Sequence, residues 1–233
     1  MYAVKKIMVS LLLCSSVSVA LFAQQAASTP APTQQPAAHV DALQLYRSGN
    51  YEAAIKQTLH EIQADRNNMD SYAVLCWSYN TLKRYNEAIQ YATQAYQISK
   101  SDHRIVGILA EANFGLKHDQ AALDYYQKFI TLGQNMGGWD PRYLRDAYRD
   151  MGDIYTRIGE FHHADISFVA AIAYDRGPSA YEPQRAARLW VRLGFAREQL
   201  KDKAAAEAAY QTALAKDAQS DDAKAGLDRV KAL

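Results

Sequence analysis

The histidines and cysteines of this sequence are the side chains that could hold a metal ion or attack a substrate. The histidines are His39, His60, His103, His118, His162 and His163. A zinc site needs several such ligands at short, characteristic spacings. No histidine here has a second histidine or a cysteine at such a spacing, and the adjacent His162 and His163 would point to different sides of a helix. The sequence therefore predicts no metal site.

Catalytic chemistry has little other support in the sequence. Cys76 occupies a position where a small buried residue is expected, which favours a structural thiol over a nucleophile. Gly137 and Gly138 lack the lysine and the preceding strand of a phosphate-binding loop. Because no nucleophile, base and orienting group can be assembled, we predict that the protein is not an enzyme and binds no cofactor.

The first 23 residues have the layout of a secretory signal peptide. Lys5 and Lys6 precede an uncharged apolar stretch, residues 7–22, that ends in small residues. We expect cleavage near residues 20–24, after Ala20 or Ala23, and export to the periplasm. The alternative is that residues 7–23 remain uncleaved as a membrane anchor, although such a stretch is short for a bilayer span.

Residues 24–38 are predicted to be a flexible linker. They hold three of the six prolines, with Gln and Ala, and no charged residue. Without the leader only Cys76 remains, so no internal disulfide can form. Loss of Lys5 and Lys6 leaves 24 basic against 25 acidic residues, a net charge of −1. This balance gives no reason to expect nucleic acid as a partner.

A repeated pattern organises the rest of the chain. Five alanines, each within a similar apolar and aromatic pattern, lie 34, 34, 42 and 42 residues apart: Ala54, Ala88, Ala122, Ala164 and Ala206. A period in this range is typical of solenoids, in which stacked helical units share one core. Around Gly49 and Asn50 the pattern indicates a helix, a turn and a second helix.

These units resemble the tetratricopeptide repeat, with a small residue at position 8 and alanine at position 20. Position 8 holds Ala42, Cys76, Ala110, Gly152 and Gly194, and Trp190 and Leu193 also match the start of the fifth unit. The resemblance covers about residues 38–219. It implies an all-α fold, a right-handed α-solenoid of about five helix-turn-helix units plus a C-terminal capping helix.

The expected boundaries follow from the repeat. The solenoid occupies residues 39–219, with units near 39–68, 69–102, 103–136, 145–178 and 187–220, and a capping helix occupies 221–233. Eight added residues precede each of the last two units, and we assign them to longer loops and to first helices extended at their N-termini, with Asp140 and Pro141 beginning a helix.

Two departures from the family pattern bear on packing. The proline near position 32 is missing from every unit, so we expect helix ends to be set by Asn67-Asn68 and Ser101-Asp102, which are good N-cap residues. In the third unit Asp119 replaces an aromatic residue and Phe129 stands where alanine is usual, so we expect its packing to deviate.

In tetratricopeptide arrays the first helices line a concave groove, and the resemblance assigns this sequence's groove positions. They hold Trp77, Asn80, Arg104, Glu111, Phe114, Arg149, Asp153, Arg157, Arg188, Arg192 and Phe195. We expect an apolar N-terminal half and a charged C-terminal half.

The sequence leaves two interpretations open for each of the main groove residues. Trp77 is of the type most enriched at binding hot spots, or it packs against the linker or a neighbouring unit. Arg149, Arg188 and Arg192 could bind carboxylates of a partner, or they are neutralised by neighbouring aspartates. The clamp that holds a C-terminal carboxylate in some family members needs lysine and asparagine positions that are not matched here.

The sequence favours a scaffold of the bacterial cell envelope that binds a segment of another protein in this groove. The alternative is a periplasmic component of a transport system that binds a small hydrophobic ligand near Trp77 and Phe114. Self-association through the groove or the capping helix is a further alternative for its partners.

Overall fold

Helices in pairs make up the part of the chain that the computed structural model describes, residues 41–136, 140–175 and 182–232. The pairs are α2 (Ala42–Arg47) with α3 (Tyr51–Ala64), α4 (Met69–Thr81) with α5 (Tyr85–Ile98), α6 (His103–Gly115) with α7 (Asp119–Asn135), α8 (Pro141–Arg157) with α9 (Phe161–Tyr174), and α10 (Pro183–Gln199) with α11 (Lys203–Lys216), followed by α12 (Asp221–Ala232). We call the earlier member of each pair the first helix and count α12 with the first helices.

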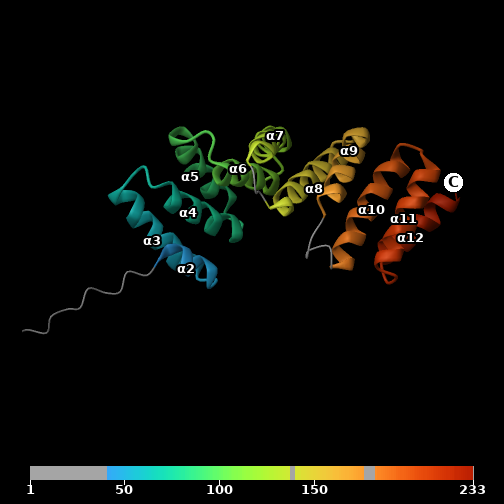
Figure 1. The fold of residues 1–233 in the computed structure, drawn as a ribbon, viewed down its shortest axis with the longest axis horizontal. Coiled ribbons are helices and arrows are strands. Elements are labelled where there is room, and N and C mark those ends of the chain that lie inside the picture. Colours follow the sequence, from blue (N-terminus) through green and yellow to red (C-terminus); the bar gives the residue numbers. More distant parts are fainter. Residues whose placement is uncertain (1–40, 137–139, 176–181, 233) are drawn as a thin grey trace, which may run out of the picture. The chain divides into compact units, whose positions relative to one another are not determined.

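Each helix packs against the next one in the chain, so the pairs follow one another as a stack (Figure 1). Smaller contacts between helices two places apart occur for α2 with α4, α4 with α6, α8 with α10, and α10 with α12. All of these are first helices, which in these four pairs lie close enough to touch. The all-α fold and its helical solenoid are confirmed.

The turn inside each pair is built the same way. A residue with a left-handed backbone follows each first helix: Gly49, Lys83, Lys117, Gly159 and Lys201. In the turn between α4 and α5, the N–H groups of Lys83 and Arg84 donate to the carbonyls of Asn80 and Tyr79, which closes the helix end. The φ of Gly49 is 82°, as expected for this glycine, whereas lysine pays a steric cost there.

Side-chain caps begin several first helices. Asn68 accepts from the N–H of Ser71, Asp102 from that of Arg104, and Asp140 from that of Arg142, with Pro141 as the first residue of α8. These caps were expected from the sequence and are confirmed. They replace the family's proline as the signal that sets the helix start.

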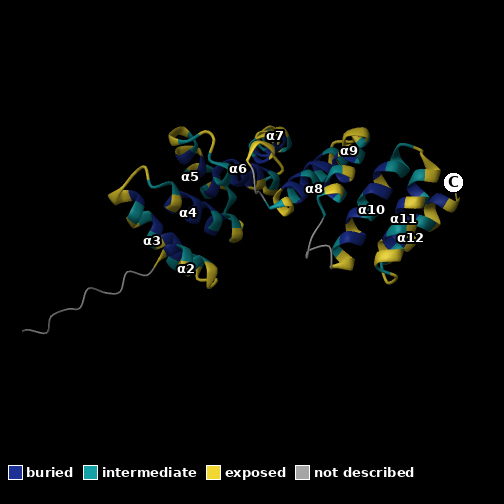
Figure 2. Ribbon diagram, viewed as in Figure 1, coloured by how far each residue is buried: buried dark blue, intermediate teal, exposed yellow. Residues whose placement is uncertain are grey.

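The core lies where neighbouring helices meet (Figure 2). The five repeat alanines are fully buried, and Gly152 has no room for a Cβ because the ring of Phe168 lies against it. In the third unit the bulk of Phe129 is accommodated by Gly107, whose missing side chain leaves space for the ring. The unusual residue is therefore compensated within its own unit.

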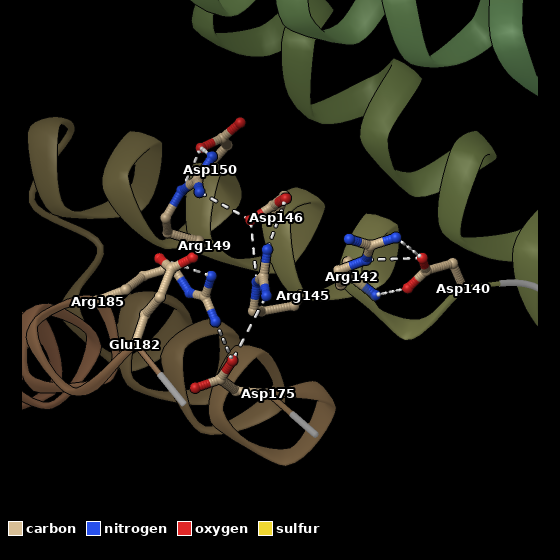
Figure 3. Close-up of polar contacts among 9 residues, drawn as sticks. All are labelled: Asp140, Arg142, Arg145, Asp146, Arg149, Asp150, Asp175, Glu182 and Arg185. Atoms are coloured by element: carbon tan, nitrogen blue, oxygen red, sulfur yellow. Dashed lines mark hydrogen bonds and ion pairs between the residues drawn. The ribbon is translucent and has the colours of Figure 1, made fainter. Parts of the chain in front are cut away.

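A network of arginines and carboxylates joins α8 to α9 and α10 (Figure 3). Asp175, at the end of α9, accepts from Arg145 of α8 at 3.4 Å and from Arg185 of α10 at 3.3 Å. The side chains of Asp175 and Arg145 are only 8% and 7% exposed. This network fixes α8 relative to the following unit.

Several sequence predictions lie outside the described residues: the leader 1–23, the linker 24–38, His39, and the glycines at 137 and 138. Within the described ranges, no helix has the length and apolar character needed to cross a membrane.

Candidate partner-binding surface

The predicted groove residues all lie on first helices, on what we call the first-helix face, the surface formed by α2, α4, α6, α8, α10 and α12. Trp77 of α4 is half-buried there and packs against Tyr46 of α2, with ring centroids 5.9 Å apart. Its indole also contacts the apolar cluster that contains Val74. Trp77 therefore helps to hold α2 on α4 and still reaches the surface.

Asn80 of α4 and Glu111 of α6 are brought together. The side-chain Nδ2 of Asn80 donates to Oε2 of Glu111 at 2.8 Å. The Oδ1 of Asn80 is buried and has no hydrogen-bond partner among the described residues. Because a buried acceptor without a donor is costly, this oxygen is a place where a ligand could add a bond.

Glu111 is exposed, yet its surroundings disfavour the charged form of its carboxylate. Partial desolvation by the surrounding protein and repulsion from Asp150 and Asp146 raise its pKa to about 7. Desolvation also raises the pKa of the buried Asp150, against the opposing effects of Arg149 and of a 2.8 Å hydrogen bond from Tyr126. A carboxylate in such surroundings gains from a cation placed against it.

The other charged groove residues on α6 and α8 have partners within the chain. Arg104 pairs with Asp102 and Asp70. Arg149 pairs with Asp146 at 2.8 Å and Asp150 at 2.7 Å. This arginine is therefore neutralised by neighbouring aspartates, one of the two alternatives that the sequence left open. Arg157 pairs with Asp119 of α7, and its guanidinium lies 5.5 Å above the ring of Phe114.

The two predicted groove arginines of α10, Arg188 and Arg192, differ in whether they form an ion pair. The Nε of Arg192 donates to Oδ1 of Asp153 at 2.8 Å, so this pair of predicted residues is neutral. Arg188 is exposed and makes no ion pair with any described residue. Phe195 is 36% exposed and meets Phe161 edge to face at 6.4 Å.

A pocket of about 300 Å³ opens on this face between α8, α10 and α12. Its lining is Asp153, Thr156, Phe168, Val191, Arg192, Phe195, Tyr210, Asp222, Ala225 and Arg229. Phe168 and Tyr210 are buried and give it an aromatic base, while the charged side chains stand at its edge. The Oγ1 of Thr156 is buried in the lining, and no residue in the described ranges forms a hydrogen bond with it.

The base of the pocket is held by packing and hydrogen bonds. Tyr210 lies between Gly194 and Gly226, neither of which has room for a Cβ. Its hydroxyl donates to Oε2 of Glu198 at 2.7 Å, and Arg229 binds the same carboxylate at 2.9 Å. These contacts place Arg229 at the edge of the pocket.

The sequence reasoning placed an apolar pocket near Trp77 and Phe114, and the pocket described here is not lined by either residue. It lies in the C-terminal half, which was expected to be charged rather than aromatic. Thr156, Tyr210 and the residues of α12 were missed. The two glycines facing Tyr210 are the signal that could have found its base.

Among the described residues, no group of histidine, cysteine and acidic side chains is arranged to hold a metal ion.

Two of the helix pairs match a known family of repeats. The Tetratricopeptide repeat family matches residues 70–102 and 187–219, which correspond to the α4–α5 and α10–α11 pairs. The chain therefore contains segments that match the tetratricopeptide repeat. A comparison with curated proteins by sequence gives no match.

Several solved structures have a similar fold. The chain is 24% identical to a MamA structure, with a TM-score of 0.64, over 77% of this chain and 96% of that one. It is 20% identical to MamA 41-end from Desulfovibrio magneticus RS-1, with a TM-score of 0.56, over 69% and 84%. YrrB, described as a TPR protein with an unusual peptide-binding site, is 18% identical with a TM-score of 0.64, over 82% and 89%.

Proposed function

We propose that this chain is a non-enzymatic scaffold that binds an extended or helical segment of another protein on its first-helix face. The observation that carries the proposal is the pocket between α8, α10 and α12. It is open to the surface, has an aromatic base and carries charged side chains at its edge. This is the arrangement that binds one apolar side chain and orients the polar backbone beside it.

Among the aromatic side chains that line the pocket, Phe195 is the most exposed. It is 36% exposed, whereas Phe168 and Tyr210 are 1% and 0% exposed. Three of the four charged side chains of the lining are already paired, Asp153 with Arg192 and Arg229 with Glu198, while Asp222 forms no ion pair with a described residue. A partner therefore meets a preorganised surface and need not neutralise the paired groups itself.

The likeness to YrrB supports a peptide or protein ligand, since that protein shares the fold and has a peptide-binding site. The setting that we propose is the bacterial cell envelope, with export directed by residues 1–23 and the linker 24–38 separating the solenoid from the leader. The support for this setting is the sequence of the N-terminus.

Site-specific photo-cross-linking in cells tests the proposal. A photoreactive amino acid replaces Phe195, and the matched control replaces Gln211, which is exposed on α11 away from the first-helix face. We expect a discrete protein adduct from position 195 that the control position does not give, and we expect it in the envelope fraction. The same adducts from both positions, or none at position 195, would refute the proposed surface.

The alternative function is binding of a small hydrophobic ligand for a transport system. The aromatic base of the pocket favours it, but the volume of about 300 Å³ is at the lower end of the range for small-molecule sites. Native mass spectrometry of the purified protein distinguishes the two, because a bound metabolite or lipid would add a defined mass that a Phe195→Trp variant loses.

A further inference from the structure

Glu111 differs from the neighbouring carboxylates of α8, which pair with arginines of the chain. Asp146 and Asp150 pair with Arg149, and Asp153 pairs with Arg192. Glu111 forms no ion pair with a described residue, and its hydrogen-bond partner is the neutral amide of Asn80. An exposed carboxylate flanked by like charges has a free place for a cation.

Asn80 adds a second acceptor at the same place. Its Nδ2 is engaged by Glu111, and its buried Oδ1 has no donor in the part of the chain that the structure describes. The two side chains thus offer oxygen acceptors side by side. Lysine ammonium and arginine guanidinium groups carry several N–H donors and no acceptor, so either matches this pair of oxygens.

Aromatic residues lie next to these oxygens on the same helices. Trp77 is three residues before Asn80 on α4, and Phe114 is three residues after Glu111 on α6, so each shares a helix face with its polar neighbour. Both rings are half-buried. Phe114 already accepts one cation, since the guanidinium of Arg157 lies 5.5 Å from its ring centroid.

We propose that Asn80 and Glu111, flanked by Trp77 and Phe114, form a subsite for a lysine or arginine side chain of the bound partner segment. We call these four residues the cation subsite. The proposal rests on the proposed function and names one chemical feature of the partner. The aliphatic stem of the side chain packs on the rings while its charged end meets the carboxylate and the amide oxygen.

The electrostatics of Glu111 agree with this assignment. Tyr126 of α7, and Asp146, Arg149 and Asp150 of α8, are the titratable and charged groups that act on it. Desolvation and the two aspartates together raise the pKa of Glu111 to about 7 despite the opposing effect of Arg149, so the positive charge present does not compensate the carboxylate. A partner cation adds positive charge and returns the pKa of Glu111 toward its ordinary value.

Selection from a displayed library of random twelve-residue peptides, performed at pH 8 on the full chain, tests the subsite. Peptides that lose binding to a Phe195→Ala variant are retained, and we expect a lysine or arginine to be enriched at one position. In a synthetic copy of the best peptide, methionine then replaces that basic residue. This change should weaken binding to the unaltered protein at least about tenfold.

A variant cycle separates the subsite from general electrostatics. Glu111→Gln keeps the hydrogen bond with Asn80 and removes the charge, so the methionine change should cost less than about threefold in this variant. Glu207→Gln on α11 is the matched control and should retain the full tenfold effect. Thermal unfolding confirms that each variant is folded.

Two failures can be told apart. If the retained peptides need no basic residue, or if Glu111→Gln keeps the full effect of methionine, the cation subsite is wrong and the pocket stands. If no selected peptide depends on Phe195, the proposed function fails together with the subsite.

Discussion

Asn80 and Glu111, 31 residues apart in sequence, join the first helices of successive units through a 2.8 Å hydrogen bond. The repeat pattern assigned both residues to the same face but did not show that they meet. Their contact places a carboxylate of raised pKa and a buried oxygen to which no described residue donates at one spot of the first-helix face. Both features destabilise the folded chain on its own, and both favour a ligand that supplies a positive charge or a hydrogen-bond donor.

Glu111→Gln is expected to stabilise the fold at pH 8 and to have little effect at pH 5. The pKa of Glu111 is about 7 in the folded chain, above its ordinary value, so the folded state holds a proton that the unfolded state releases. The stability due to this proton is present below about pH 4.5 and is lost as the pH rises through 7. Urea unfolding at pH 5 to 8 measures the difference between the variant and the unaltered protein, and a difference independent of pH would contradict the assignment.

The buried network at α8 predicts a large loss for one carboxylate and a small loss for another. Asp175→Asn leaves Arg145 and Arg185 without their shared partner, and we expect a loss of about 2 to 3 kcal/mol in the free energy of unfolding. Glu182→Ala removes a carboxylate that is 68% exposed in the same network, and we expect less than about 1 kcal/mol. Equal losses in denaturant unfolding would show that the network does not bear on stability.

Gly152→Ala should destabilise the fourth unit. A Cβ at Gly152 would lie 2.4 Å from an atom of the Phe168 ring, which is 1% exposed and has no room to move. We expect a loss of about 1 to 3 kcal/mol despite the better helix propensity of alanine. Adding Phe168→Leu should recover part of this loss, and additive losses in the double variant would be evidence against the close contact.

Substitutions at two left-handed turn residues should change the stability of the protein in opposite directions. Lys83 has a φ of 59°, and Lys83→Gly should stabilise the protein by about 1 kcal/mol because glycine adopts this conformation without a steric cost. Gly159, at the equivalent place two units later, has a φ of 83°, and Gly159→Ala should destabilise by a similar amount. Melting temperatures of the two variants that shift in the same direction would contradict this view of the turns.

The fold was predictable because its signals are local and repeat. The alanines at a fixed period, the small residues at position 8 and the caps at Asn68, Asp102 and Asp140 each specify a helix, its end or its packing. The left-handed residues were predictable only at glycines, since Lys83, Lys117 and Lys201 take that conformation under the constraint of helix packing. Gly107 opposite Phe129 is a compensation between two helices and leaves no mark in either helix alone.

The candidate site was predictable as a face and not as a pocket. The resemblance to the tetratricopeptide repeat gives the side of a helix on which a residue lies, and this is how Asp153, Arg192 and Phe195 were chosen. The pocket depends on how α12 packs beside α10, on the space left by Gly226, and on the ring of Tyr210 beneath it. These are distances between helices, and the repeat pattern carries no information on them.

The central claim, that the first-helix face binds a protein segment through the pocket at Phe195, is tested most directly by calorimetric titration. A peptide taken from the cross-linked partner is titrated into the unaltered protein, Phe195→Ala and the control Gln211→Ala on α11. The account predicts a Kd at least about tenfold higher for Phe195→Ala and unchanged for Gln211→Ala. The same Kd for all three proteins would contradict it.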